Sequence, residues 1–420
     1  MSSAAPALTL RIARSLSARL RSVRASPALS PVALREAWTS RRGGHPVDEA
    51  HGPHLEAALD WLCRAQDATP DDGFARAWAL AWNAHFRAAG WQPSYPETTG
   101  YIIPTLYSAA RLLGRPALAE RAGRAARWEV AVQLPSGAVR GGVVGEAPSP
   151  AAFNTGQVIL GWLAAWEETG DAAFAAAAAR AARFLAGCEE GGRFARGSSR
   201  FARGDATAYN ARAAWALAEA GRALGEPSFV DAAARVLRAT AAARDPSGWF
   251  PGCCLYDPAR PLLHTLAYAV RGLLEGGRVL EDADLVRAAE TALERLAEQI
   301  GGDGWMSGRY ARDWRPAAEW SCVTGQAQIA NNWLRLREVT GDGRWLEPAA
   351  RSIRFVKRTQ NRAAPEDGLR GGIPGSWPVD GEYGRYEVLN WAAKFFADAL
   401  MRHTAATSPG GGRGGVSQLA

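Results

Sequence analysis

One pattern of helix starts recurs six times along the 420 residues of the chain, at steps of 52 to 65 residues. The recurring positions are Thr99, Thr155, Thr207, Thr265, Thr324 and Leu389. Each of them opens a segment that is apolar nearly all round, and a helix of that kind is buried on most sides. Repetition at such a period indicates a fold made of similar supersecondary units that bury their apolar faces against one another.

A second kind of segment alternates with the first. Each segment of this kind has one apolar stripe among many Arg and Glu residues; they lie at 54–66, 118–133, 174–188, 229–243, 285–299 and 345–359. In 285–299, for example, Leu285, Ala289, Leu293 and Leu296 recur at steps of three or four residues, as on one face of a helix. Gly-rich turns follow these segments. We expect them to form outer helices that cover the inner ones.

Six inner and six outer helices in alternation predict an all-α fold, the (α/α)6 toroid of six helical hairpins. A linear solenoid is the alternative, but it would need polar capping repeats at its ends. The last inner segment, 390–396, is as apolar as the middle ones, which favours closure into a ring. We therefore expect a toroid domain over 45–403, with disordered tails at 1–44 and 404–420.

The formal net charge of +7 belongs to the first of these tails. Residues 1–44 hold eight Arg and one Glu, and the remaining chain has 41 basic and 41 acidic residues. A neutral body argues against nucleic-acid binding, which relies on a basic surface. Apolar residues at near-helical spacing in 8–23 fit peripheral membrane contact or an organellar transit peptide, and a solvated extension is the structural alternative. Without a secretory signal or a membrane-spanning run, we expect a cytoplasmic location, with membrane association through this tail.

The five Cys residues are scattered and include no C-x-x-C pair. This spacing predicts neither a disulfide framework nor a zinc knuckle, and it fits a reducing compartment. Cys253, Cys254, Asp257 and His264 could form a zinc site like that of protein prenyltransferases, but no spacing rule supports one. We expect no metal and no cofactor.

Side chains at the openings of the inner helices should converge on one cavity, because all six helices begin at the same rim. Glu97, Tyr101, His264, Glu319 and Tyr386 are the candidates for acid/base catalysis. The candidates for substrate binding are Asn154, Gln157, Asp205, Tyr209, Arg212, Trp320, Gln326, Glu387 and Asn390, and Tyr95, Tyr268 and Tyr383 should converge on the same cavity. Helix N-termini add partial positive charge that suits a carboxylate. For each carboxylate, a helix-capping role is the structural alternative.

This inventory suits sugar chemistry of two kinds. Glycosidic cleavage needs a pair of carboxyl groups. Removal of a proton beside a uronate carboxylate needs a base, together with Asn, Gln or Arg side chains that neutralise the carboxylate. For His264, a hydrogen-bonded position in the core is the structural alternative.

Four sequence blocks point to a family. They are YPETTGYIIPTL (95–106), FNTGQV (153–158), WSCVTGQAQ (320–328) and NWAAKFFADAL (390–400). They resemble blocks of a bacterial toroid family encoded in exopolysaccharide-synthesis clusters, which is similar to six-hairpin glycosidases and to the C-terminal domain of glucuronyl C5-epimerases. The resemblance spans residues 54–403 and places Glu97, Tyr101, Asn154, Gln157, Gln326 and Asn390 at the family's motif positions.

The resemblance implies a carbohydrate-active enzyme of polysaccharide biosynthesis. Its substrate would be a uronate-containing polysaccharide or oligosaccharide, and its reaction C5 proton chemistry (epimerase or lyase) or glycosidic cleavage. A non-catalytic glycan-binding or assembly protein of the same pathway is one alternative. A terpene-cyclase-like toroid is another, although the chain has no D-x-D-D or D-D-x-x-D motif.

Overall fold

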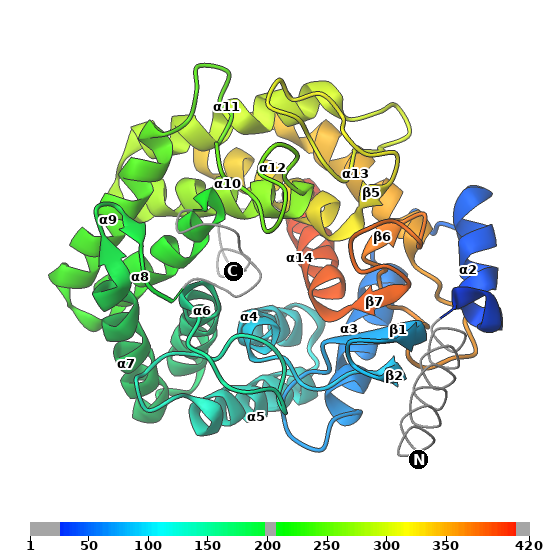
Figure 1. The fold of residues 1–420 in the computed structure, drawn as a ribbon, viewed down its shortest axis with the longest axis horizontal. Helices are drawn as coiled ribbons and strands as arrows, with labels where there is room; N and C mark the ends of the chain where they lie inside the picture. Colours follow the sequence, from blue (N-terminus) through cyan, green and yellow to red (C-terminus); the bar gives the residue numbers. More distant parts are fainter. Residues whose placement is uncertain (1–25, 198–206, 409–420) are drawn as a thin grey trace, which may run out of the picture.

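The computed structural model describes residues 26–197 and 207–408, which close into a ring of helical hairpins (Figure 1). The inner helices are α4 (Pro96–Leu113), α6 (Ala152–Thr169), α8 (Ala211–Leu224), α10 (Leu263–Leu280), α12 (Val323–Thr340) and α14 (Asn390–Thr407). The outer helices are α3 (Gly52–Asp67), α5 (Pro116–Val132), α7 (Ala172–Cys188), α9 (Pro227–Ala242), α11 (Ala283–Gln299) and α13 (Leu346–Thr359). The last inner helix, α14, contacts α12, α4 and α3. The ring is therefore closed, and the predicted (α/α)6 toroid is confirmed.

The Thr-Gly pair repeated in several helix starts is a packing motif. The Thr99 hydroxyl accepts a hydrogen bond from the backbone N–H of Phe74 (3.0 Å), and Thr155 makes the same kind of bond to the loop before α6. A Cβ added to Gly100 would lie 2.6 Å from the Cα of Val158 in the next inner helix. The Thr thus ties a helix start to the preceding loop, and the Gly permits close approach of two inner helices.

Five of the six inner helices end at a residue in the left-handed conformation, whereas α14 ends at Ser408 in an extended conformation. Four of the five residues are Gly114, Gly170, Gly225 and Gly341, with φ between 62° and 77°. Helix α10 continues past Gly277, and Glu281 takes the left-handed conformation (φ 53°). Most of the connections at this end are two-residue turns, such as 114–115.

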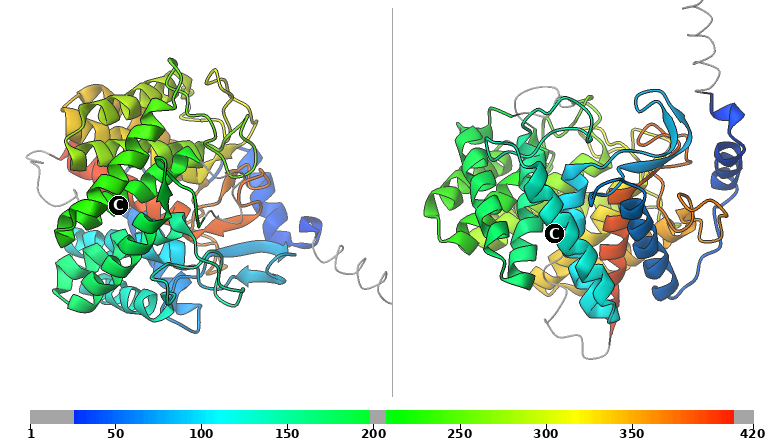
Figure 2. Two further views of the ribbon diagram at one scale, coloured as in Figure 1. Left: turned by 60° about the vertical axis from the view of Figure 1, so that its left-hand side comes forward. Right: turned by 90° about the horizontal axis from the view of Figure 1, so that it is seen from below.

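At the end where the inner helices begin, the connections are long loops that carry short strands (Figure 2). Strands β1 (Ala77–Asn83), β2 (Ala88–Trp91) and β7 (Glu387–Leu389) form an antiparallel sheet in the order β2-β1-β7. The pairs β3 (Glu189–Glu190) with β4 (Arg193–Phe194) and β5 (Ser321–Cys322) with β6 (Ser376–Trp377) are shorter. Since β1 precedes α4 and β7 precedes α14, the three-stranded sheet joins the first hairpin to the last.

Residues 26–44 belong to the folded body, although the sequence predicts a disordered tail there. They form the short 3-10 helix η1 (Pro27–Leu29) and helix α2 (Pro31–Arg41) (Figure 1). The Ser30 hydroxyl caps α2 and donates to the Leu80 carbonyl of β1 (2.5 Å). The Glu36 carboxylate is buried and accepts a hydrogen bond from Asn361 (2.9 Å). These polar bonds and the buried Ala33 attach the helix, which lies outside the repeat that predicted the other helices.

The described chain also extends the ring at its carboxyl end, because α14 continues to Thr407 instead of ending near 403. The apolar spacing in 8–23 and the Gly-rich stretch after 408 lie outside the described residues. No helix within 26–197 or 207–408 combines the length and apolar character needed to cross a lipid bilayer.

Candidate functional site

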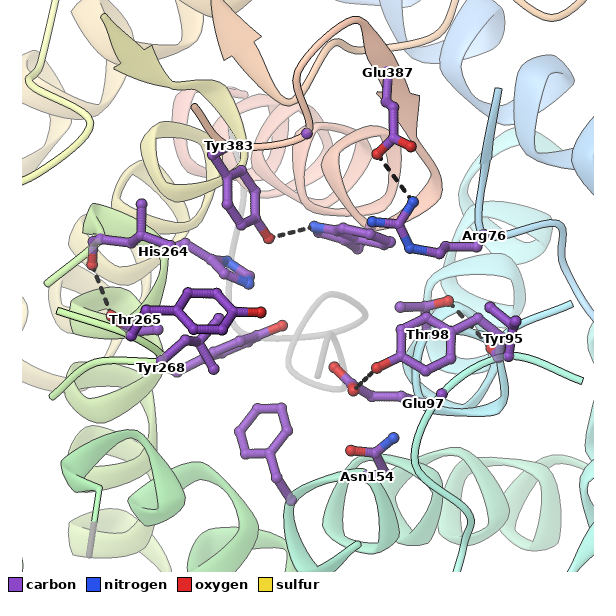
Figure 3. Close-up of a pocket in the computed structure, with 18 of the residues that line it drawn as sticks. Arg76, Tyr95, Glu97, Thr98, Asn154, His264, Thr265, Tyr268, Tyr383 and Glu387 are labelled. Atoms are coloured by element: carbon purple, nitrogen blue, oxygen red, sulfur yellow. Dashed lines mark hydrogen bonds and ion pairs between the residues drawn. The ribbon is translucent and has the colours of Figure 1, made fainter. Parts of the chain in front are cut away.

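A cavity of about 440 Å³ opens at the end of the ring where the inner helices begin (Figure 3). The openings of α4, α6, α10 and α14, the short 3-10 helix η2 (Ala208–Asn210) before α8 and several of the long loops contribute to its lining. A concave site of this size is typical of small-molecule binding. The predicted convergence thus occurs, although the opening of α12 contributes no lining residue.

The sequence-predicted residues divide into three groups. Glu97, Tyr101, Asn154, Tyr209, His264 and Glu387 line the cavity. Gln157, Arg212, Glu319, Trp320, Gln326, Tyr386 and Asn390 do not line it. Asp205 lies outside the described residues.

Glu97 stands in the first turn of α4, and its Oε2 accepts a hydrogen bond from the Tyr95 hydroxyl (2.5 Å). Burial raises the pKa of Glu97 to about 7, against the opposing effects of the Tyr95 hydrogen bond and the positive charges of Arg76 and Arg212. A carboxyl group with this pKa exchanges its proton readily near neutral pH, which is the property required of a general acid or base.

His264 lies in the first turn of α10 and is 6% exposed. Its Nδ1 donates to Oε1 of Gln328 in α12 (2.7 Å), so Nε2 is the acceptor nitrogen of a neutral ring. Burial lowers the pKa of His264 to about 4, which keeps the imidazole neutral at pH 7. The ring centroid lies 4.5 Å from that of Tyr268 and 5.0 Å from that of Tyr383. These contacts fix both the tautomer and the orientation of the imidazole.

Glu387 positions an arginine. Its carboxylate accepts hydrogen bonds from Arg76 Nη1 (3.0 Å), Asn83 Nδ2 (2.7 Å) and Gln92 Nε2 (2.6 Å). The Arg76 guanidinium also lies 5.1 Å from the ring of Trp391. Its Nε and Nη2 have no hydrogen-bond partner among the residues that the structure describes, so they are available to a ligand carboxylate.

Aromatic residues form much of the remaining wall. Tyr383 accepts a hydrogen bond from Trp391 Nε1 (2.9 Å), and Tyr268 donates to the Tyr101 hydroxyl (3.5 Å). Burial raises the pKa of all three phenols, so they stay protonated at neutral pH. Apolar ring faces with protonated hydroxyls suit the faces and hydroxyl groups of sugars. Sequence reasoning did not single out Arg76, Phe153 and Trp391, although Phe153 and Trp391 stand in two of the quoted blocks.

Two predicted substrate-binding amides hold loops to the ring instead. Gln326 donates to the Gly304 carbonyl and accepts a hydrogen bond from Ser321 (2.7 Å). Asn390 donates to the Ala75 carbonyl (3.0 Å) and to the Thr98 hydroxyl (2.8 Å). Both side chains are fully buried, so neither reaches a substrate in the cavity.

Three further residues of this group also lie away from the cavity. Glu319 is exposed on the loop before α12, and the neighbouring Trp320 ring lies 6.0 Å from the Arg309 guanidinium. Tyr386 has a positive φ of 56° on the loop before β7, with the Arg385 guanidinium 5.6 Å from its ring. Acid/base roles for Glu319 and Tyr386 therefore do not fit the structure. Their places in long loops, which the repeat does not define, explain the difference.

Neither a family model nor a curated protein sequence matches this chain. Solved structures do share its architecture. An unsaturated glucuronyl hydrolase specific for heparin superposes with a TM-score of 0.66 at 17% identity, over 84% of this chain and 96% of its own. An unsaturated glucuronyl hydrolase from Bacillus sp. GL1 gives 0.64 at 15% identity, over 84% and 96%. A cellobiose 2-epimerase from Bacillus thermoamylovorans B4167 gives 0.65 at 11%, over 83% and 98%.

The chain has the fold of these toroids. At such low identity the likeness establishes the fold and leaves the reaction to be argued from the site. In the two described stretches, no three His, Cys, Asp or Glu side chains come together in a way that could hold a metal ion. Cys253, which the zinc alternative would need, is buried and donates its thiol to the Thr265 carbonyl (3.2 Å).

Proposed function

We propose that this protein is a carbohydrate-processing enzyme that acts on a uronate-containing glycan. The observation that carries the proposal is that the Glu97 carboxyl group and the neutral His264 imidazole line one cavity together with Arg76, whose Nε and Nη2 are available to a ligand (Figure 3). The solved structures of similar fold include hydrolases of glucuronyl sugars and an epimerase. The resemblance to an exopolysaccharide family adds a biosynthetic role to the proposal.

The leading reaction is proton transfer at C5 of the uronate. A carbon next to a carboxylate releases its proton more easily when a cation stabilises the negative charge that develops on the carboxylate. Arg76 can supply this charge through a bidentate contact. Glu97 or His264 would then remove the C5 proton. Return of a proton to the opposite face inverts C5. Cleavage of the C4–O4 bond instead gives a 4,5-unsaturated sugar, and the sugar released through O4 takes up a proton on that oxygen.

The carboxylates in the cavity favour this chemistry over classical glycosidic cleavage. Cleavage of that kind needs a second carboxyl group free to act as base or nucleophile. Glu387 accepts hydrogen bonds from three donors. Of the other two lining carboxylates, Glu382 pairs with Arg309 (3.1 Å), and Glu146 lies 3.0 Å from Nε2 of His85. Glu97 is the lining carboxyl group whose burial gives it a pKa near neutrality.

Hydrolysis of a terminal unsaturated glucuronyl residue is a second candidate. Several solved structures of this fold are unsaturated glucuronyl hydrolases. A single acid such as Glu97 could protonate the 4,5-double bond at C4, and water could add at C5. The hemiketal formed would open and release the attached sugar.

Incubation with uronate oligosaccharides in deuterated water tests the proposal. Deuterium at C5 without cleavage indicates epimerisation, a new ultraviolet-absorbing double bond indicates a lyase, and loss of that absorbance from an unsaturated substrate indicates hydrolysis. Binding without any of these changes would support the glycan-binding alternative. The charged groups in the cavity wall argue against a terpene cyclase. If the protein were one, it would neither bind nor convert uronates.

Glu97→Gln and Tyr101→Phe test the site itself. If both variants fold and retain full turnover, the cavity is not the catalytic site.

A further inference from the structure

Arg212 is a buried cation beside the cavity. It lies in the first turn of α8, is 1% exposed, and donates through Nε to Gln157 Oε1 (2.7 Å). Its Nη2 has no hydrogen-bond partner, and no carboxylate within 26–197 and 207–408 forms an ion pair with it. Burying a charge without a counter-ion is costly, so this arrangement calls for a functional explanation.

Three aromatic rings surround this guanidinium. The negative charges of Asp398 and Glu275 also act on it, but these carboxylates form their ion pairs with other cations. Its central carbon lies 5.2 Å from the Tyr268 ring, 5.3 Å from Trp215 and 5.6 Å from Phe395. Contacts of this kind offset part of the desolvation cost. Tyr268 also lines the cavity, so one ring separates the buried charge from the space that a substrate would occupy. An apolar layer screens charge poorly.

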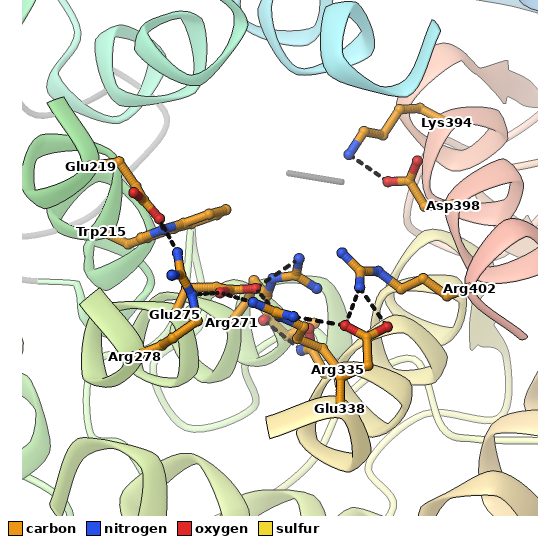
Figure 4. A network of polar contacts seen from close by, with 12 residues as sticks. Trp215, Glu219, Arg271, Glu275, Arg278, Arg335, Glu338, Lys394, Asp398 and Arg402 are labelled. Carbon is orange, nitrogen blue, oxygen red and sulfur yellow. Dashed lines mark hydrogen bonds and ion pairs between the residues drawn. The ribbon is translucent and has the colours of Figure 1, made fainter. Parts of the chain in front are cut away.

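The neighbouring buried cations differ from Arg212 because they have carboxylate partners (Figure 4). Lys394 pairs with Asp398 (2.6 Å), and Arg335 pairs with Glu275 (2.8 Å). Arg271 also pairs with Glu275 (3.0 Å), and Arg402 pairs with Glu338 (2.7 Å). Arg212 is therefore the buried cation in this part of the described ring that forms no ion pair.

We propose that Arg212 is a specificity-determining residue that makes the cavity favour anionic sugars without touching them. This inference rests on the proposed function and adds a second cation, behind the wall, to the direct contact of Arg76. The positive charge of Arg212 acts to lower the pKa of both Glu97 and His264, so its electrostatic effect extends to groups that line the cavity. Arg212 would thus act on the uronate and on the groups that exchange its proton.

Two variants remove the charge effect in different ways. Arg212→Gln deletes the cation. Gln157→Glu keeps it but places a carboxylate against its Nε, which neutralises the pair with little change in shape. Arg278→Gln is the matched control, because Arg278 lies in the network of Figure 4, is partly exposed and pairs with Glu219 and Glu275.

Binding of methyl glucuronide and methyl glucoside is measured by calorimetry for each protein. We expect both Arg212→Gln and Gln157→Glu to weaken the glucuronide about tenfold, from a Coulomb energy at about 10 Å in a medium of intermediate dielectric, and to leave the glucoside unchanged. Arg278→Gln should change neither. Equal weakening of both sugars in both variants would assign Arg212 to packing and overturn the inference, as would no weakening at all.

A second readout does not depend on sugar binding. The titration of His264 is followed by NMR in the same proteins, and its pKa should rise in Arg212→Gln and Gln157→Glu but not in Arg278→Gln. If the wild type binds neither sugar, the proposed function fails for these ligands. The His264 titration then tests by itself whether the charge of Arg212 acts on groups in the cavity. An unchanged His264 titration in both variants would then overturn it.

Discussion

At one end of the ring, long loops such as 360–389 surround an open cavity. At the other end most connections are two-residue turns, and side chains of the inner helices occupy the centre. The cavity lies where the inner helices begin and their dipoles are positive, which suits an anionic ligand. The opposite end holds the network of Glu219, Arg278, Glu275, Arg335, Glu338 and Arg402 (Figure 4). Cations are favourable at helix C-termini. The shared direction of the inner helices thus favours an anionic substrate at one end of the ring and buried cations in ion pairs at the other end.

The largest effect is expected at the cavity end. Glu97→Gln should lower kcat by about 10²–10⁴-fold, the usual loss when a general acid or base is removed. Glu319→Gln is the matched control, because it removes an exposed carboxylate on a loop that does not line the cavity. Steady-state kinetics on a uronate substrate measures both. Equal activity of the two variants would contradict the assignment of Glu97.

At the closed end, Glu275→Gln should destabilise the protein. It would leave Arg271 and Arg335 buried without this carboxylate, and breaking a buried ion pair from one side costs about 3–5 kcal/mol. Glu294→Gln, which breaks an exposed pair with Arg344, should cost about 1 kcal/mol or less. Urea unfolding compares the two. Similar small losses would mean that the network is well hydrated.

Helix packing near the cavity should be less tolerant than packing at the periphery. A Cβ at Gly272 in α10 would collide with the backbone of Ala211 and Arg212, so Gly272→Ala should cost about 1–3 kcal/mol. Gly187, in the outer helix α7, has open space around it. Gly187→Ala should therefore stabilise the protein by up to about 1 kcal/mol through helix propensity. Thermal melts measure both, and a stabilised Gly272→Ala would contradict the packing described.

Another effect at the cavity end concerns pH and stability. The pKa of Glu97 is about 7 in the folded protein, above its ordinary 4.5. The folded state therefore holds this proton more tightly, and the stability it contributes is complete below pH 4.5 and is lost as pH rises through 7. The glutamine in Glu97→Gln cannot ionise. The melting temperature of this variant should therefore rise relative to that of the wild type between pH 5 and pH 8. A constant difference across this range would argue against the raised pKa.

The fold was predictable because similar helix starts recur around the ring. The Thr-Gly pairs at Thr99, Thr155 and Thr324 recur since each marks a helix start at the same place in the ring, and the Gly beside each packs on a neighbouring inner helix. Gln326 and Asn390 belong to these shared starts, and their buried bonds serve the architecture.

The cavity was harder to predict because its residues are the ones that differ between repeats. His264 and Asn154 each precede a marker Thr and line the cavity, whereas the equivalent Val323 does not. Arg76 comes from the loop just before β1 and depends on the distant Glu387 for its position. No local spacing connects two residues that pair only when the ring has closed.

Pairing of β1 with β7 also has a consequence for synthesis. It pairs Ala77 with Leu389, so the sheet beside the first hairpin cannot be completed until nearly the whole chain has been synthesised. A nascent chain on the ribosome would expose the free edge of β1 and the apolar flanks of α3 and α4 until the final hairpin emerges. Chaperone demand should therefore be set by the last stretch translated.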